Sequence, residues 1–193
     1  MKNILAITAC LKRCSIAVQY ENRVYEANEN SDAAANLVYI ADELFKANNI
    51  DVKKLNGVIT ASGPGSFTGI RVAQSFAKGV ALACNIPSVS VSYFDVIQKS
   101  YGQSLNNLVV VIKSEKNQAY YKIVKDNQMG VAPYEELSNL FPKDALVIGE
   151  KLPCDLDVTE IPNFRDAKHL LQFTELLNES STVAPLYINA KSQ

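Results

Sequence analysis

The segment with the clearest chemical character is Gly63-Pro64-Gly65-Ser66-Phe67-Thr68-Gly69-Ile70-Arg71. It follows a short β-branched run at 58–61 and precedes a run with helical spacing, which predicts a glycine-rich strand-to-helix turn. The first backbone N–H groups of such a helix, together with the helix dipole, can hold an anion. The candidate anion-contacting residues are Gly63, Gly65, Ser66, Thr68 and Gly69.

The spacing in this segment excludes two well-known phosphate loops. No Lys-Ser or Lys-Thr pair follows a glycine as in a Walker loop. The glycine intervals also differ from the dinucleotide fingerprint, and no acidic ribose partner follows a clear next strand. Pro64 removes one N–H donor. On physical grounds we favour a tight turn with Ser66 or Thr68 capping the helix over a phosphate site.

Residues suited to catalysis or metal binding are sparse. The chain has one histidine, His169, and four cysteines, at positions 10, 14, 84 and 154. A zinc peptidase needs closely spaced histidine and acidic ligands, and a Ser66 nucleophile would need a base that nothing links to it. We therefore predict no catalytic residue and no metal site. Cys10 and Cys14 are expected to face each other across a hairpin turn at 11–13.

The charge balance argues against independent binding of RNA. The formal net charge is −1, and the longest basic runs are the pairs Lys12-Arg13 and Lys53-Lys54. Phosphate contacts supply most of the affinity of nucleic-acid-binding proteins, so a basic face would be expected of one. Any contact with tRNA is therefore expected to be indirect.

The N-terminal stretch Ile7-Thr8-Ala9-Cys10 is similar to a lipoprotein cleavage box. The apolar run before it is shorter than the ~7–15 residues of a signal peptide. We interpret it as a buried strand and expect a cytoplasmic protein without a membrane segment.

Hydrophobic periodicity predicts an α/β fold with mixed sheets. Strands are predicted at 4–8, 14–20, 23–27, 58–61 and 87–91, with a tight turn at Glu21-Asn22. Helices are predicted from Ser31 or Asp32 to about 48, at 68–84, and from 95. Later elements are a hairpin of 108–113 and 119–125, a strand at 145–148, a helix at 167–179 and a strand or extended tail at 183–189. The polar stretch 102–107 suggests domains of 1–102 and 103–193.

The two long helices of the first domain have unusually wide apolar faces. In the second, Gly69, Ala73, Ala77 and Ala81 recur every four residues and form a ridge of small side chains. Such a ridge lets another helix approach closely. We predict that it forms a partner interface together with Leu37 and Ala41 of the first helix, with Val72, Phe76 and Val80 facing the sheet. The alternative is that both faces are buried within one lobe.

The 63–71 segment is very similar to the signature of the TsaB (YeaZ) family, and the likeness extends over about residues 1–95. It includes Ile4–Ile7, Cys14–Val18, Ala77–Ala81 and Ile86-Pro87. The resemblance implies the actin-like ATPase (ASKHA) fold, with two RNase-H-like lobes of which the second is abbreviated. The first lobe would carry the glycine-rich segment.

The resemblance also implies a function in making N6-threonylcarbamoyladenosine 3′ of the tRNA anticodon. In that scheme TsaC makes threonylcarbamoyl-AMP, TsaD transfers the group, TsaB is a non-catalytic scaffold for TsaD, and the ATPase TsaE joins the complex. Relatives associate through the helical face, so a homodimer is a second arrangement that the resemblance implies.

The chain departs from the family pattern where nucleotide-using relatives hold phosphate and metal. Asp-Thr-Ser is replaced by Thr8-Ala9-Cys10, Asp-Ala-Arg by Lys113-Ser114-Glu115, and a helix histidine is lost in 32–36. Each change removes a nucleotide or metal contact, which favours a scaffold without a cofactor. The alternative that stays open is a weak ATP- or ADP-binding protein or ATPase of the actin and sugar-kinase fold.

Overall fold

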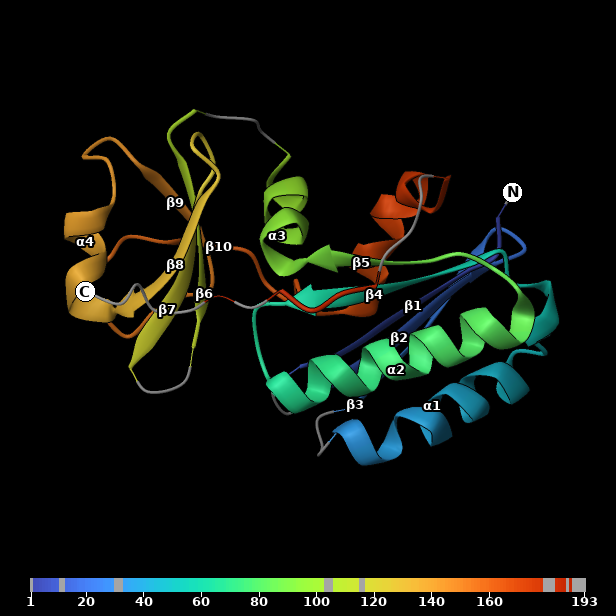
Figure 1. Cartoon of the computed structure of the whole chain (residues 1–193). Helices are drawn as coiled ribbons and strands as arrows, with labels where there is room; N and C mark the ends of the chain where they lie inside the picture. The colour runs from blue at the N-terminus through green and yellow to red at the C-terminus, as the bar shows by residue number, and fades with distance from the viewer. Residues whose placement is uncertain are drawn as a thin grey trace. The chain divides into compact units, whose positions relative to one another are not determined.

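Two five-stranded mixed sheets form the framework of the computed structural model, which describes residues 2–10, 13–29, 33–102, 106–114, 117–178, 183–186 and 188 (Figure 1). The first sheet has the order β3-β2-β1-β4-β5, and its strands are β1 (Ile4–Cys10), β2 (Arg13–Tyr20), β3 (Arg23–Glu29), β4 (Gly57–Gly63) and β5 (Ser88–Ser92). The second has the order β10-β9-β6-β7-β8, with strands β6 (Leu108–Lys113), β7 (Gln118–Ile123), β8 (Gln128–Pro133), β9 (Leu146–Gly149) and β10 (Thr159–Glu160).

The two sheets share one topology. In each, the first three strands in chain order are antiparallel neighbours and the last two run parallel to the first. This repeated arrangement, with mixed sheets in both halves, confirms the predicted actin-like fold.

The turns of the first hairpins set the strand register. Glu21 and Asn22 have φ of 47° and 68°, as a two-residue turn with the twist of the strands requires. Between β1 and β2 the register pairs Cys10 with Arg13 and Ala9 with Cys14. The prediction that the two cysteines face each other is therefore wrong, because two residues rather than three separate the paired ends. The turn residues 11 and 12, like the predicted helix caps Ser31 and Asp32, lie outside the described residues.

One face of the first sheet is covered by two long helices, α1 (Ala33–Ala47) and α2 (Phe67–Cys84), which lie side by side in Figure 1. A short 3₁₀ turn, η1 (Val52–Lys54), precedes β4. Asn85 ends α2 in the left-handed conformation, with its N–H donating to the carbonyls of Ala81 and Leu82. The core on this face joins apolar side chains of β1 and β2 to both helices.

The opposite face of the first sheet is covered by η3 (Ala167–Asn178), a mainly 3₁₀ segment with a kink at Phe173. Its Leu177 packs so closely on Gly57 that a Cβ there would lie 2.6 Å from the leucine methyl Cδ1. The tail 183–186 is extended rather than a strand. Leu186 N–H donates to the carbonyl of Ser62 at 2.7 Å, and the Ser90 hydroxyl donates to the carbonyl of Ala184 at 3.0 Å.

The chain divides into two compact units, which we call unit 1 (Met1–Ser92 and Arg165–Leu186) and unit 2 (Tyr93–Phe164 and Tyr187–Gln193). This division differs from a single boundary at residue 102. Helix α3 (Tyr93–Tyr101) packs on β6 and β9, whereas η3 returns to β1, β2 and β4. The boundary between the two units depends on how α3 and η3 pack. The polar stretch 102–107 gives no indication of that packing.

Unit 2 is an abbreviated version of unit 1. After the third strand, unit 1 has α1 of 15 residues, whereas unit 2 has the 3₁₀ turn η2 (Tyr134–Glu136) and the four-residue α4 (Leu137–Leu140). Where α2 follows β4 in unit 1, an extended segment at 150–158 follows β9. Its Leu152, Cys154, Leu156 and Val158 alternate toward the core of the second sheet. Among the described helices, none has the length and apolar character of a membrane span.

Candidate functional site

The glycine-rich segment forms the predicted turn from β4 into α2. Gly63 has φ of 108°, a conformation that side-chain-bearing residues rarely adopt, and a Cβ there would lie 2.9 Å from Cδ1 of Ile70. The Gly63–Pro64 peptide bond is cis. Gly65 has φ of 158°, which is nearly extended. Within this turn, Gly63 is therefore the position that requires glycine.

Ser66 rather than Thr68 caps α2. The Ser66 hydroxyl accepts a hydrogen bond from the N–H of Gly69 at 3.4 Å, and the Ser66 carbonyl accepts one from Ile70 at 3.0 Å. Thr68 is exposed on the first turn. Arg71 stacks over the ring of Phe67, with its guanidinium carbon 3.7 Å from the ring centroid. The serine cap occupies one N–H that an anion would use, and anion binding here stays a prediction.

The predicted partner ridge is internal to unit 1. Ala73, Ala77 and Ala81 are buried in the core with Leu37 and Ala41 of α1, and Gly69 is half-buried. The fold itself therefore buries most of the residues that are predicted to bind a partner, which is the alternative stated in the sequence analysis. The reason is that small side chains let α2 lie close to the sheet and to α1.

The residues expected to face the sheet are instead at the flank of α2. Val72, Phe76 and Val80 are only partly buried. Gln74 is buried in their place, and its side-chain amide donates to the carbonyl of Ala61 at 3.3 Å. A rotation of the predicted helical wheel by about one position accounts for this difference.

The helix pair exposes other large apolar side chains. Val38 and Tyr39 on α1 are 63% and 65% exposed, and Phe67 and Leu82 on α2 are 54% and 85% exposed. Sequence reasoning missed this set because it followed small residues, whereas the exposed positions are scattered large ones. Isolated exposed apolar residues are common, but several on one pair of helices form a candidate interaction surface. We call Val38, Tyr39, Phe67 and Leu82 the exposed helix set.

The end of the β1–β2 hairpin is a third site of interest, because it carries Thr8-Ala9-Cys10, where the sequence departs from the family pattern. The Thr8 hydroxyl donates to the carbonyl of Arg165 at 2.7 Å, and the Ser15 hydroxyl accepts from the N–H of Ala167 at 2.7 Å. Arg13 forms an ion pair with Asp166, with Nη2 2.6 Å and Nε 2.7 Å from the same carboxylate oxygen. We call this arrangement of the hairpin end on residues 165–167 the hairpin closure.

Sequence analysis did not identify the hairpin closure. The available signal was an acidic residue, Asp166, immediately before the predicted helix at 167, which is typical of a helix start. Nothing in the sequence pattern links that helix start to the hairpin, because Arg13 and Asp166 are 153 residues apart in the chain.

Burial shifts the pKa values of Cys14 and His169. Burial, with the charge of Glu29 adding to it, raises the pKa of the Cys14 thiol to about 11. Burial and the neighbouring Lys168 lower the pKa of His169. No contact joins His169 to Ser66 in the described chain. Among the described residues, no three His, Cys, Asp or Glu side chains gather in a way that could hold a metal ion.

The fold and the glycine-rich turn define a protein of the actin-like ATPase class. A family model described as "TsaD: tRNA N6-adenosine threonylcarbamoyltransferase" matches residues 29–133, more than half of the chain. The curated relatives described below are named TsaB, and the chain belongs to this TsaB (YeaZ) family.

Two of these relatives, both described as "tRNA threonylcarbamoyladenosine biosynthesis protein TsaB", come from Buchnera aphidicola. The protein from subspecies Acyrthosiphon pisum is 26% identical over 179 residues, which is 91% of this chain and 79% of the relative. The protein from subspecies Baizongia pistaciae is 28% identical over 126 residues. That match covers 63% of this chain and spans only 57% of the relative.

Solved structures agree on the fold. A Pseudomonas aeruginosa protein described as similar to peptidase YEAZ has a TM-score of 0.75 at 21% identity, covering 97% of this chain and 100% of that one. A structure described as "YeaZ from Pseudomonas aeruginosa" has a TM-score of 0.71 at 20% identity with the same coverage.

Proposed function

We propose that this chain is a non-catalytic scaffold subunit in the biosynthesis of tRNA N6-threonylcarbamoyladenosine, supporting a TsaD-like transferase. The names of the curated relatives support the pathway. The transferase would move threonylcarbamoyl from threonylcarbamoyl-AMP to the adenosine 3′ of the anticodon. The tRNA would contact the complex chiefly through the partners, given the net charge of −1.

The observation that carries the scaffold role is the hairpin closure. In this position a nucleotide-using relative needs free hydroxyls, N–H groups and carboxylates to hold phosphate and Mg²⁺. Here the Thr8 hydroxyl, the Ser15 hydroxyl and the Arg13 guanidinium are all engaged with residues 165–167. A phosphate would have to displace a part-buried ion pair and two buried or part-buried hydrogen bonds.

The exposed helix set is the surface that we propose for the TsaD-like partner. The TsaD model matches a range of this chain that includes both α1 and α2, so that two related proteins would present similar helix pairs to each other. Such pairs can pack with pseudo-two-fold symmetry, and the same face would serve a homodimer when the partner is missing. A TsaE-like ATPase would join the assembled complex. The complex would act in the cytoplasm, where the tRNA is found.

The test is reconstitution with purified components. TsaC, TsaD, TsaE and unmodified tRNA are incubated with threonine, bicarbonate and ATP, with and without this chain, and the modified nucleoside is measured by liquid chromatography and mass spectrometry. We expect product only when the chain is present. The chain alone should make neither threonylcarbamoyl-AMP nor modified nucleoside.

Two results would contradict this proposal. Modified nucleoside or threonylcarbamoyl-AMP made by the chain alone would show catalysis, and an equal yield without the chain would show that the scaffold is not needed. ATP turnover by the isolated chain, compared with and without Mg²⁺, decides the nucleotide-binding alternative. Turnover that requires Mg²⁺ and is lost on mutation of the hairpin end would favour an ATPase.

A further inference from the structure

Strand β3 is an open edge of the first sheet. It stands at one end of the strand order β3-β2-β1-β4-β5, whereas at the other end the Ser90 hydroxyl of β5 is bonded to Ala184 of the tail. The residues of β3 pair with β2 in one continuous register, without a bulge, and include no proline. Bulges and prolines are devices that keep an exposed edge from pairing with another strand, and β3 has neither.

The backbone of β3 alternates between bonding to β2 and facing the open edge. Because the hairpin has the two-residue turn Glu21-Asn22, the flanking pair Tyr20 and Arg23 exchanges its backbone hydrogen bonds, and so does every second pair after it. The residues between these pairs, whose N–H and C=O groups point away from β2, are Val24, Glu26 and Asn28. In the described part of the chain, these outward backbone groups have no hydrogen-bond partner.

The side chains at the outward positions are exposed as well. Val24 is 50% exposed, which is unusual for a large apolar residue of a strand. Glu26 forms an ion pair with Lys168 of η3, with Oε2 and Nζ 3.3 Å apart. On the other face of β3, Tyr25 and Ala27 pack against the core. A strand added at this edge would therefore cover Val24 and leave the core contacts in place.

The sequence of β3 is complementary to itself in the antiparallel direction. When Glu26 lies opposite Glu26 of a second copy, Val24 lies opposite Asn28, and every outward residue has a partner. The same register places Arg23 opposite Glu29 at both ends, at positions where facing side chains come closest. Opposite charges at facing positions stabilise antiparallel strands, and a shift by two residues in either direction would lose both pairs.

The centre of this arrangement brings two Glu26 side chains together, and like charges at facing positions are unfavourable. Each Glu26 arrives with its own Lys168, so that charges of alternating sign meet at the axis. The central cluster has no net charge. The two Arg23–Glu29 pairs therefore decide the register.

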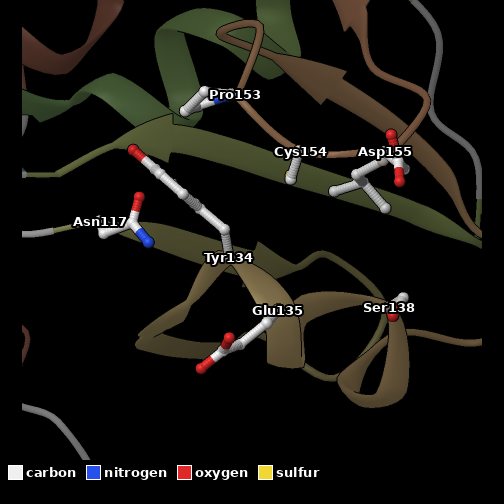
Figure 2. A pocket seen from close by; sticks show the side chains of 8 residues that line it. Asn117, Tyr134, Glu135, Ser138, Pro153, Cys154 and Asp155 are labelled. Atoms are coloured by element: carbon white, nitrogen blue, oxygen red, sulfur yellow. The ribbon is translucent and has the colours of Figure 1, made fainter.

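The second sheet has no edge of this kind. Its outer strand β8 carries no charged residue that would fix a register, and its last residue, Pro133, has no N–H. The next residues, Tyr134 and Glu135, line a pocket of about 530 Å³ together with Asn117 and Cys154 (Figure 2). This pocket of unit 2 joins the β6–β7 turn, the η2–α4 region and the extended segment after β9, and it has no part in strand pairing.

We propose that β3 pairs with β3 of a second copy of this chain, antiparallel and with Glu26 at the two-fold axis. The two five-stranded sheets then form one continuous sheet. The pairing shares no residue with the exposed helix set, so it goes beyond the proposed scaffold function and does not depend on it. One short strand edge buries less area than a standard interface, so the dimer is expected to be weak.

The test measures self-association of the full chain by sedimentation equilibrium from micromolar to millimolar concentrations. The parent protein carries Leu82→Arg, because that change removes self-association through the helices. Arg23→Glu and Glu29→Arg each place like charges opposite each other in the dimer. The double variant restores opposite charges with their positions exchanged. The matched control is Lys143→Glu, the same reversal at an exposed lysine of unit 2.

A further variant tests the edge without changing a charge. Val24→Pro removes one outward N–H and keeps the backbone bonds between β2 and β3, since proline is tolerated where the N–H faces away from the sheet. This variant is needed because Glu29 also accepts a hydrogen bond from Asn36 at 3.4 Å, so its replacement could disturb the fold. Circular dichroism checks the folding of every variant.

We expect each single charge reversal, and Val24→Pro, to weaken self-association about tenfold or more. The double variant should return to within about threefold of the parent, and Lys143→Glu should change self-association by less than about threefold. Amide exchange followed by NMR locates the contact. The amides of Val24, Glu26 and Asn28 should exchange more slowly as the concentration rises, whereas those of Tyr25 and Ala27, which are bonded to β2, should not change.

Three results would overturn this proposal. The first is a Leu82→Arg protein that stays monomeric up to millimolar concentration. The second is self-association that both charge reversals leave unchanged, or that a folded double variant does not restore. The third is association during which the outward amides exchange at a constant rate, because the contact then lies elsewhere. If the double variant does not fold, Val24→Pro decides, and unchanged self-association of that variant would refute the pairing.

Discussion

Arg13 and Asp166 form an ion pair in which one carboxylate oxygen lies 2.6 Å from Nη2 and 2.7 Å from Nε of the guanidinium. The Asp166 side chain is only 5% exposed and that of Arg13 is 29% exposed. The pair fastens η3 to the hairpin end of the first sheet. The same contact occupies the guanidinium of Arg13 at the hairpin end, which is the basis of our proposal that this end does not bind phosphate.

The first prediction concerns this ion pair. Asp166→Ala should lower the free energy of unfolding by about 2 kcal/mol, because it removes a charge-assisted hydrogen bond and an ion pair from a partly buried guanidinium. The measurement is urea unfolding followed by circular dichroism. The control is Asp42→Ala, which breaks the exposed Lys46–Asp42 pair on α1 and should have no measurable effect. Equal effects of the two changes would show that the hairpin closure adds nothing to stability.

The second prediction separates two glycines of unit 1. Gly63→Ala should destabilise the protein by about 1–3 kcal/mol, because φ is 108° and the new methyl would lie 2.9 Å from Ile70 Cδ1. Gly79→Ala should stabilise it by about 0.5–1 kcal/mol, since α2 has open space there and alanine favours helix. Thermal and urea unfolding of both variants give the signs. A stable Gly63→Ala protein would mean that the turn does not require glycine.

The third prediction concerns pH and Cys14. Its thiol has a pKa raised from 9.0 to about 11, so between these values the unfolded chain loses a proton that the native chain retains. Stability should therefore fall as the pH rises from about 9 to about 11. Cys14→Ala should make that fall shallower, as measured by urea unfolding across this range. An unchanged slope would contradict the shift.

The same thiol should be slow to react in the folded protein. At pH 8 iodoacetamide should label the half-buried Cys154 well before the buried Cys14, because the thiolate is the reacting species. Peptide mass spectrometry resolves the two sites. Labelling of both at one rate would show that Cys14 is accessible.

The strands and long helices of unit 1 could be predicted from the sequence because each combines a clear hydrophobic period with a turn or cap signal. Helix α2 was predicted at 68–84 and spans Phe67–Cys84. Strand β8 was missed, since Gly130 and Pro133 argue against a strand when read alone. In the structure Tyr121 on β7 lies directly opposite Gly130, and a Cβ at Gly130 would lie 2.5 Å from its hydroxyl oxygen. Such cross-strand covering is a tertiary relationship that the local pattern does not contain.

The candidate sites divide in the same way. The turn at Gly63 and the cap at Ser66 depend on neighbouring residues, and the sequence contains those. The hairpin closure, the pocket of unit 2 and the outward side of α2 depend on segments far apart in the chain. An amphipathic pattern shows that a helix has an apolar side, but not what covers that side. Ala73, Ala77 and Ala81 are an example, because the core of unit 1 covers them and not a partner protein.

The last prediction tests the exposed helix set as the surface for a TsaD-like partner. Leu82 on α2 is 85% exposed and Val38 on α1 is 63% exposed, so arginine at either position can extend into solvent in the free chain. Leu82→Arg and Val38→Arg should therefore keep the circular dichroism and thermal transition of the parent protein. In a complex the same cation would be buried against an apolar partner, and binding should weaken about tenfold or more. Ala77→Arg should instead unfold unit 1, because Ala77 is fully buried in the core.

The matched control is Leu140→Arg, which places the same cation at an exposed leucine on α4 of unit 2 instead of on α1 or α2. Each variant is mixed with purified TsaD, and the complex is quantified by analytical ultracentrifugation, which also reports homodimers. We expect Leu82→Arg and Val38→Arg to reduce both assemblies while Leu140→Arg leaves them intact. If Leu140→Arg is the variant that breaks the complex, the interface lies on unit 2. Ala77→Arg could instead fold normally and fail to bind the partner. That result would make the small-residue ridge the docking surface, and α1 would then have to move away from α2 when the partner binds.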